Sequence, residues 1–157
     1  MVDFAKLLQL HREGKMPKIP VSIDNLSTSY TLLDTAIPYN GIVRKCRLAD
    51  KTDKSGNNYL TGIEIEVIEP EEWRGKTVFV NYICLPSEIS ANMGVAERRK
   101  AEDQGVMLAR FVKAFKVPYT DEGIDPDDCV GCEGQFTVKE GEYNGKPKTE
   151  IDDFLID

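Results

Sequence analysis

The chain is poor in the residues on which much enzyme chemistry depends. It contains a single histidine, His11, and four cysteines among 157 residues. Ser–His–Asp and Cys–His catalysis both need a positioned histidine base, and His11 lies in a predicted N-terminal extension. No pairing of a base with a nucleophile emerges elsewhere, so we expect a protein that is not an enzyme and uses no cofactor.

Long apolar runs are lacking as well. A transmembrane helix needs about 20 apolar residues, and the apolar runs here extend over only a few residues. Residues 1–16 hold charged side chains and no continuous apolar stretch, which does not fit a signal peptide. The hydrophobic content of 41% is still ordinary for a folded domain. We therefore expect a cytoplasmic protein that does not bind a membrane.

Basic residues are also fewer than acidic ones, and the excess of acids is confined to one part of the chain. The net charge is −7, which taken alone argues against a nucleic-acid-binding protein because such proteins need a basic surface. Residues 120–157 hold 12 acids and 3 bases, a net charge of −9, whereas residues 1–119 hold 17 bases and 15 acids, a net charge of +2. This asymmetry is typical of a basic binding body with an acidic tail, although a solvated acidic face gives the same count.

The cysteines include one C-x-x-C motif, Cys129 to Cys132, which could be half of a zinc site or a redox pair. A zinc site would need the isolated Cys46 and Cys84 to converge on it, and a redox pair is expected at the start of a helix rather than before a strand. Residues 135–138 read as a strand. We therefore favour two small, semi-buried cysteines without a metal.

Acidic residues cluster in two turns. Residues 50–58 loosely resemble a calcium-binding loop, but lysines occupy ligand positions and the glycine is out of register. Asp125, Asp127 and Asp128 could hold a hard cation, yet Pro126 favours a turn whose carboxylates cap a helix. No metal site is predicted.

The hydrophobic pattern divides the chain into two parts. Residues 1–36 form an extension with a helical stripe over residues 3–13, a linker, and a short strand near residues 31–33. Residues 37–157 form the main domain. Its predicted elements are strands at 42–48, 59–69 and 77–85, helical structure within 88–117, and strands at 134–139 and 148–156.

The order of these elements indicates a fold class. Three strands, a helix and two strands is the order of a five-stranded OB barrel with its helix between the third and fourth strands. An SH3-like barrel lacks that helix, and a ferredoxin-like fold needs a helix after its first strand. We predict a mainly β protein with an OB-fold barrel and an N-terminal helical extension.

Several short motifs also resemble a known family. They are Gly41 to Val43, Thr52 to Leu60, Trp73 to Phe79, Phe111 to Phe115, Val130-Gly131 and the hairpin Tyr143 to Lys146. In these motifs, which span residues 37–156, the chain resembles phage-encoded single-stranded-DNA-binding proteins with OB folds, often catalogued as a domain of unknown function. Cys129 and Cys132 depart from that pattern. The resemblance implies a non-enzymatic coat for exposed strands during phage DNA replication or recombination, in the cytoplasm of an infected bacterium.

Binding a single strand requires cations for phosphates and aromatic rings on which bases stack. OB folds present these on strands two and three and on the flanking loops. The candidate cations lie on the first strand, in the loop that follows it and at the turn before the third strand: Lys45, Arg47, Lys51, Lys54, Arg74 and Lys76. The candidate stacking residues are Tyr59, Trp73, Phe79 and Tyr82.

Strand alternation sorts some of these residues. Phe79 and Tyr82 are three residues apart, so they are expected on opposite faces, with Phe79 outside and Tyr82 inside. Arg47 is expected beside Lys45 on the outer face, with Cys46 and Leu48 inside. Trp73 stacks on a base or caps the barrel. Glu64 and Glu66 point outward and would repel phosphates, so the DNA path avoids part of that face.

The C-terminal residues allow two interpretations. Asp152, Asp153, Phe154 and Asp157 resemble acidic tips with which single-strand-binding proteins recruit replication enzymes, and such a tip can compete with DNA. In the alternative, which we favour, these residues except Asp157 belong to the last strand.

The leading hypothesis is therefore a protein that binds single-stranded DNA largely without sequence preference. Its expected partners are single-stranded DNA and, through the acidic C-terminus, phage or host replication and recombination proteins, and a homo-oligomer is allowed. The alternative is an OB-like protein–protein interaction module without nucleic-acid binding, which the net charge of −7 and the outward glutamates favour.

Overall fold

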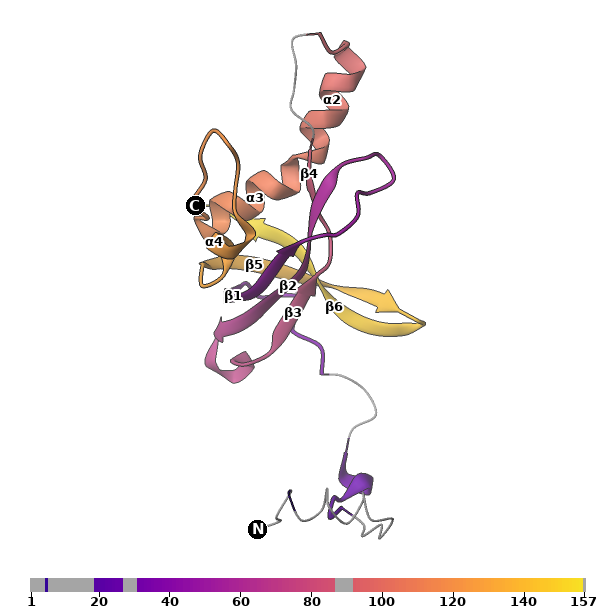
Figure 1. Cartoon of the computed structure of the whole chain (residues 1–157). Coiled ribbons are helices and arrows are strands. Elements are labelled where there is room, and N and C mark those ends of the chain that lie inside the picture. The colour runs from indigo at the N-terminus through magenta and orange to yellow at the C-terminus, as the bar shows by residue number, and fades with distance from the viewer. Residues whose placement is uncertain (1–4, 6–18, 27–30, 87–91, 157) are drawn as a thin grey trace. The chain divides into compact units, whose positions relative to one another are not determined.

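A computed structural model describes residue 5 and residues 19–26, 31–86 and 92–156 (Figure 1). The chain divides into two compact units, Met1–Thr31 and Leu32–Asp157. In the first unit, the described residues 19–26 are exposed and contain a short 3-10 helix, η1 (Ile23–Asn25). The helix predicted over residues 3–13 lies outside the described residues, except for Ala5, which is helical. The strand predicted at residues 31–33 is not present.

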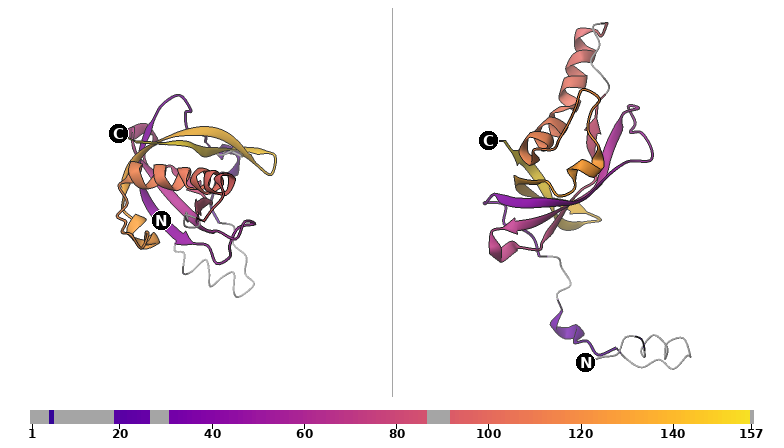
Figure 2. Two further views of the ribbon diagram at one scale, coloured as in Figure 1. Left: turned by 90° about the horizontal axis from the view of Figure 1, so that it is seen from above. Right: turned by 60° about the vertical axis from the view of Figure 1, so that its left-hand side comes forward.

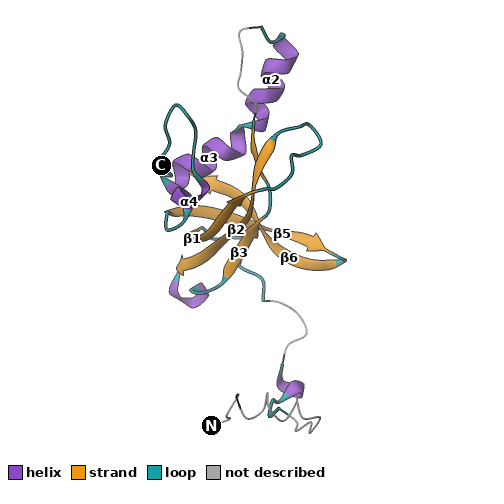
Figure 3. Ribbon diagram, in the orientation of Figure 1, coloured by secondary structure: helices purple, strands orange, loops and turns teal. Residues whose placement is uncertain are grey.

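The second unit is mainly β, as predicted, and is built on an antiparallel sheet of six strands (Figure 3). The strands are β1 (Tyr39–Leu48), β2 (Asn58–Glu69), β3 (Thr77–Val80), β4 (Ile83–Leu85), β5 (Glu133–Tyr143) and β6 (Lys146–Leu155). Their order is β3-β2-β1-β5-β6, with β4 also paired to β2. The sheet is not closed by pairing, although β3 and β6 at its two ends lie close together. The single third strand predicted at residues 77–85 is wrong, because residues 81 and 82 divide it.

The alternation of buried and exposed side chains is as predicted in β2 but not throughout β1. Ile63, Ile65 and Val67 of β2 are fully buried, as predicted. In β1 the register shifts on either side of Lys45, so the expected alternation fails and Leu48 is 47% exposed. Gly41 has no space for a side chain, since a Cβ would lie 2.6 Å from Ile65 and 2.7 Å from the Phe136 ring.

Two consecutive helices, α2 (Val95–Gln104) and α3 (Val106–Phe115), lie between β4 and β5 and meet at Gly105. The predicted apolar stripe is confirmed in α3, where Phe111, Val112 and Phe115 are buried. α2 buries only Ala101 and extends beyond α3, away from the strands (Figure 2). The start of the predicted helical segment, residues 88–91, lies outside the described residues.

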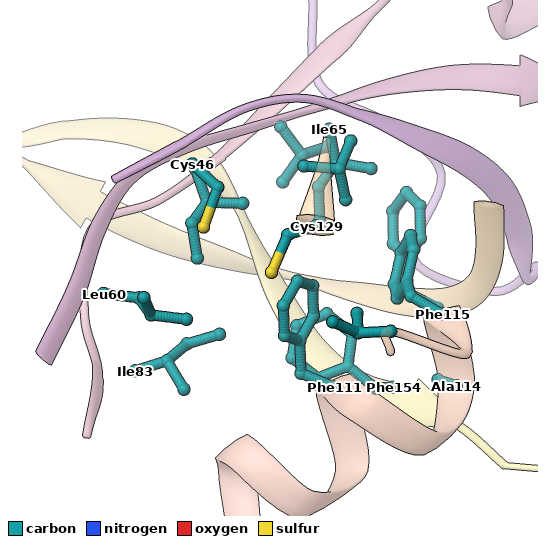
Figure 4. Packing of buried hydrophobic residues seen from close by; sticks show 14 of the residues in the cluster. Cys46, Leu60, Ile65, Ile83, Phe111, Ala114, Phe115, Cys129 and Phe154 are labelled. Carbon is teal, nitrogen blue, oxygen red and sulfur yellow. The ribbon is translucent and has the colours of Figure 1, made fainter. Parts of the chain in front are cut away.

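The core is formed by the inner face of the sheet, α3 and the short helix α4 (Pro126–Cys129) (Figure 4). The Phe111 ring lies 5.2 Å from Phe115 and 5.3 Å from Phe154 between centroids. Close contact between α3 and β5 requires Gly134, since a Cβ there would lie 2.7 Å from the Ala114 carbonyl oxygen. These contacts fix the position of β6 against α3.

The C-terminal residues form a strand, so the interpretation as a free acidic tip is wrong for Asp152, Asp153 and Phe154. All three belong to β6, and Phe154 is fully buried. Asp153 pairs with Arg110 of α3 through contacts of 2.6 and 2.8 Å, and the same guanidinium donates to the Phe154 carbonyl at 3.0 Å. Asp157 lies outside the described residues. The alternative in which these residues complete the last strand is confirmed up to Leu155.

Candidate nucleic-acid interface

The outer face of β1, β2 and β3 carries charged side chains on β1 and β2 and an aromatic ring on β3. In one row across the strands, Lys45 of β1 pairs in register with Glu64, which pairs with Phe79. Lys45 Nζ lies 3.1 Å from Glu64 Oε2, and Arg44 Nη2 lies 2.7 Å from Glu66 Oε2. The two glutamates that were expected to repel phosphates therefore neutralise the neighbouring bases of β1.

Arg47 differs from the other bases of β1. Within the described part of the chain it has no acidic partner. Its side chain crosses Gly62 of β2, where a Cβ would lie 3.1 Å from Arg47 Nε. Gly62 has a φ of 60°, in the left-handed region that favours glycine. Arg47 thus lies over Gly62 with no acidic partner among the described residues.

Lys51 and Lys54, two other predicted cations, lie exposed in the β1–β2 loop (residues 49–57). Asp53 organises this loop: its Oδ1 accepts hydrogen bonds from the amides of Ser55 and Asn57, at 2.8 and 2.9 Å. The side-chain Nδ2 of Asn57 donates to Gln104 Oε1 of α2 at 3.3 Å, so the loop lies beside the end of α2 (Figure 3).

Two tyrosines meet next to this loop. The Tyr82 ring lies 5.1 Å from the Tyr59 ring, tilted by 43°, and its hydroxyl donates to Asp53 Oδ2 at 2.8 Å. This hydrogen bond raises the pKa of Tyr82 above its ordinary value. Tyr82 is 51% exposed, so its predicted inward orientation is wrong. The physical reason is the break in pairing at residues 81 and 82, which interrupts the alternation of faces.

Phe79 on β3 is 57% exposed while its neighbour Val78 is buried, which confirms its predicted outward orientation. Because Phe79 pairs in register with Glu64, it extends the outer face beyond the Lys45–Glu64 ion pair. Phe79 therefore lies on the same face of the sheet as the bases of β1.

The remaining three predicted residues lie at the opposite end of β2. Trp73 belongs to the short helix η2 (Glu71–Trp73) and packs, partly buried, against the core. Arg74 is exposed and Lys76 is half-buried, and Val67 of β2 bonds to the turn that holds them. Val67 lies eight positions after Tyr59 in β2, a span of up to about 27 Å in an extended strand. The structure thus divides the predicted site into two groups.

Sequence reasoning missed two residues of this surface, Arg44 and Asp53. Arg44 was not considered, although it follows the buried Val43 in the alternation of β1 and points outward toward Glu66. Asp53 had been considered only as a poor calcium ligand. The Asp-x-Ser-Gly sequence of residues 53–56 is typical of a turn in which the carboxylate accepts backbone hydrogen bonds, and this signal could have identified it.

The cysteines form no metal centre among the described residues, where no three histidine, cysteine or acidic side chains could hold an ion. Cys129 is buried against Cys46, and this contact together with burial raises its pKa. Burial also raises the pKa of Cys132. Cys129 lies at the C-terminal end of α4, whereas a helix stabilises a thiolate at its N-terminal end. Both features disfavour a thiolate at Cys129.

At the N-terminal end of α4, the Asp125 carboxylate accepts a hydrogen bond from the Asp127 amide at 2.9 Å. This confirms the predicted helix cap. Among the described residues, no helix combines the length and the apolar character needed to cross a membrane.

Two structural features are therefore available for binding: an aromatic pair beside an uncompensated arginine at one end of β2, and a mixed acidic and basic turn at the other end.

A search for similarity found no protein-family model and no curated protein that matches this chain.

Proposed function

We propose that this protein binds single-stranded DNA, largely without sequence preference, through the end of the sheet that carries the β1–β2 loop. The observation on which this proposal depends is the register of Arg47, which lacks an acidic partner in the described residues. Arg47 pairs with Thr61, two residues along β2 from Tyr59, whose ring contacts the Tyr82 ring. A cation binds a phosphate and displaces its counterions. An exposed ring stacks on any base, with a free energy of about 1–3 kcal/mol per base.

The charge of the two ends of β2 favours this location. Arg47 and the β1–β2 loop together contain three bases, Arg47, Lys51 and Lys54, and two acids, Asp50 and Asp53. At the other end, residues 69–76 hold three acids against Arg74 and Lys76. The proposed site therefore has a net charge of +1 and the opposite end −1. Phosphates are expected at the first end only.

We also propose that the second unit is an OB barrel. In support, β1 lies between β2 and β5, the last two strands form a hairpin, and α2 and α3 precede that hairpin. If β3 and β4 count as one bent strand, this is the five-stranded order of an OB fold. The proximity of β3 and β6 is compatible with a partly open barrel.

The biological setting follows from the resemblance of the sequence motifs to phage proteins. In that setting the protein coats exposed strands during replication or recombination, in the cytoplasm of the infected host. Phage or host enzymes are proposed as further partners. Because Phe154 is buried, contact with them at the C-terminal end would use exposed side chains of β6 such as Asp152. Self-association remains part of this proposal.

A protein–protein interaction module is the second candidate. The observation that favours it is the neutral centre of the outer face, where Lys45 and Arg44 are paired with Glu64 and Glu66. A neutral surface with an exposed Phe79 suits a protein partner better than a polyanion.

A fluorescence-anisotropy titration with labelled oligo(dT), at two salt concentrations, separates these candidates. The wild-type protein should bind oligo(dT) more tightly than a duplex of equal length. With phosphate contacts at Arg47, Lys51 and Lys54, the logarithmic salt slope should be about −2. The variant Arg47→Ala should bind more weakly and reduce this slope by about 0.7, whereas Arg74→Ala, the matched control at the other end, should change neither. Absence of binding at low salt would reject the proposal in favour of the protein-interaction module.

A further inference from the structure

Asp53 stands out as a negative charge in the loop to which the proposed function assigns DNA. Its carboxylate makes three hydrogen bonds, with the amides of Ser55 and Asn57 on one oxygen and the hydroxyl of Tyr82 on the other. The Asn57 and Tyr82 hydrogen bonds, which favour the ionised form, lower the pKa of Asp53. The carboxylate is therefore charged at neutral pH, and Asp53 lies between Lys51 and Lys54 in the sequence.

A second acid in the same loop behaves differently. Asp50 is exposed and makes no hydrogen bond or ion pair with any residue that the structure describes. Both acids repel phosphates to a similar extent, because they lie in one solvated loop. Only Asp53 combines that repulsion with contacts that hold an aromatic ring in place.

The geometry around Tyr82 indicates what these contacts achieve. Tyr82 lies in the break between β3 and β4, where no ladder hydrogen bonds fix the chain, and its ring is 51% exposed. It is held on one side by the Tyr59 ring, 5.1 Å away, and at its tip by Asp53 Oδ2, 2.8 Å away. Without the Asp53 contact, the ring keeps its contacts with Tyr59 and Cys84 but is held less firmly. A ring that is already fixed loses less conformational entropy when a base stacks on it.

We propose that Asp53 is a positioning residue for DNA binding: it fixes Tyr82 against Tyr59, so that the exposed face of Tyr82 is ready to stack on a base. This inference depends on the proposed function. Asp53 acts through Tyr82 and makes no contact with DNA itself. The affinity that Asp53 adds by fixing Tyr82 is therefore larger than the affinity that its negative charge removes by repelling phosphates.

The test compares two substitutions that remove the same charge from the same loop. Asp50→Ala should leave oligo(dT) binding unchanged or tighten it up to about twofold, since it removes only repulsion. Asp53→Ala should weaken binding about fivefold, because it also frees the ring. Asp53→Asn should restore most of the affinity, since its amide oxygen can accept from the loop amides while its NH2 group donates to the Tyr82 oxygen.

A double-mutant cycle with Tyr82→Ala separates the positioning role from general loosening of the loop. If Asp53 acts through Tyr82, then Asp53→Ala no longer weakens binding in the Tyr82→Ala background, and at most it tightens binding about twofold, as Asp50→Ala does. A second variant, Tyr82→Phe, keeps the loop and the ring but loses the hydroxyl, and it should weaken binding about two- to fivefold.

The outcomes are distinguishable. Failure of the wild-type protein to bind oligo(dT) at low salt rejects the proposed function, and with it any role of Asp53 in binding DNA. If the wild-type protein binds, the positioning role is overturned by equal effects of Asp53→Ala and Asp50→Ala. A loss of affinity from Asp53→Ala that persists in the Tyr82→Ala background also overturns it.

Discussion

Lys45 on β1 and Glu64 on β2 form an ion pair in which Nζ and Oε2 are 3.1 Å apart. The neighbouring pair, Arg44 and Glu66, repeats this arrangement with a 2.7 Å contact. The basic strand that the sequence indicates is thus largely compensated across the sheet. Arg47 remains the cation of β1 without an acidic partner in the described residues, and the proposed DNA path is confined to its end of the strand.

The first prediction concerns this compensation. Glu64→Gln should release Lys45 for phosphate contact, tighten oligo(dT) binding about two- to fivefold at low salt and steepen the salt slope by about 0.7. The matched control is Glu140→Gln, which removes an equal charge from an exposed position of β5. Anisotropy titrations at several salt concentrations measure both. An equal effect of the two substitutions would mean that only net charge matters.

A second prediction uses the glycine beneath Arg47. Gly62→Ala and Gly75→Ala both force alanine into a positive φ, of 60° and 90°, and each should reduce the free energy of unfolding by about 1 kcal/mol. An added Cβ at Gly62 lies 3.1 Å from Arg47 Nε, whereas nothing lies within 4 Å of one at Gly75. Only Gly62→Ala should therefore weaken oligo(dT) binding. Urea unfolding and anisotropy together test this, and unchanged affinity in Gly62→Ala would contradict the role of Arg47.

The third prediction concerns the C-terminal strand. Phe154 is fully buried between Phe111 and Phe115, so Phe154→Ala should reduce the free energy of unfolding by about 3–5 kcal/mol. Ile156→Ala, at an exposed position two residues later, should change it by less than about 0.5 kcal/mol. Urea denaturation measures both. A fully stable Phe154→Ala variant would restore the interpretation of these residues as a dispensable tip.

A fourth prediction follows from the lowered pKa of Asp53, whose ordinary value is 3.8. A group whose pKa is lower in the folded state contributes stability above its ordinary pKa and loses it as the pH falls through the folded value. Between about pH 5 and pH 2, the wild-type protein should lose more stability than Asp53→Asn, which does not titrate. The difference should be small because Asp53 is solvated. Urea unfolding of both proteins across this pH range measures the difference. An equal loss of stability in the two proteins would contradict the prediction.

Local alternation was sufficient to predict the elements that have one buried face. Ile63, Ile65 and Val67 alternate with polar residues in β2, and Phe111 and Phe115 recur at a helical spacing in α3. In both elements the burial of one face in the core enforces the pattern that the sequence displays.

The candidate site was predicted less completely, because its geometry depends on contacts between strands. The register shifts on either side of Lys45 place Lys45 on the same face as Arg44 and leave Leu48 exposed. The break before Ile83 turns Tyr82 outward. Neither irregularity leaves a periodic signal in the sequence. The compensation of Lys45 by Glu64 depends on the register of two strands, which local alternation alone does not determine.

The central claim is that single-stranded DNA binds at the end of the sheet that carries Arg47, Tyr59 and Tyr82. The most direct measurement is the change in backbone amide NMR shifts of the labelled protein on addition of oligo(dT). The account predicts that the largest changes occur at these three residues and in the β1–β2 loop, while Arg74 and Lys76 stay unchanged. Changes confined to residues 73–76, or no changes at all, would contradict it.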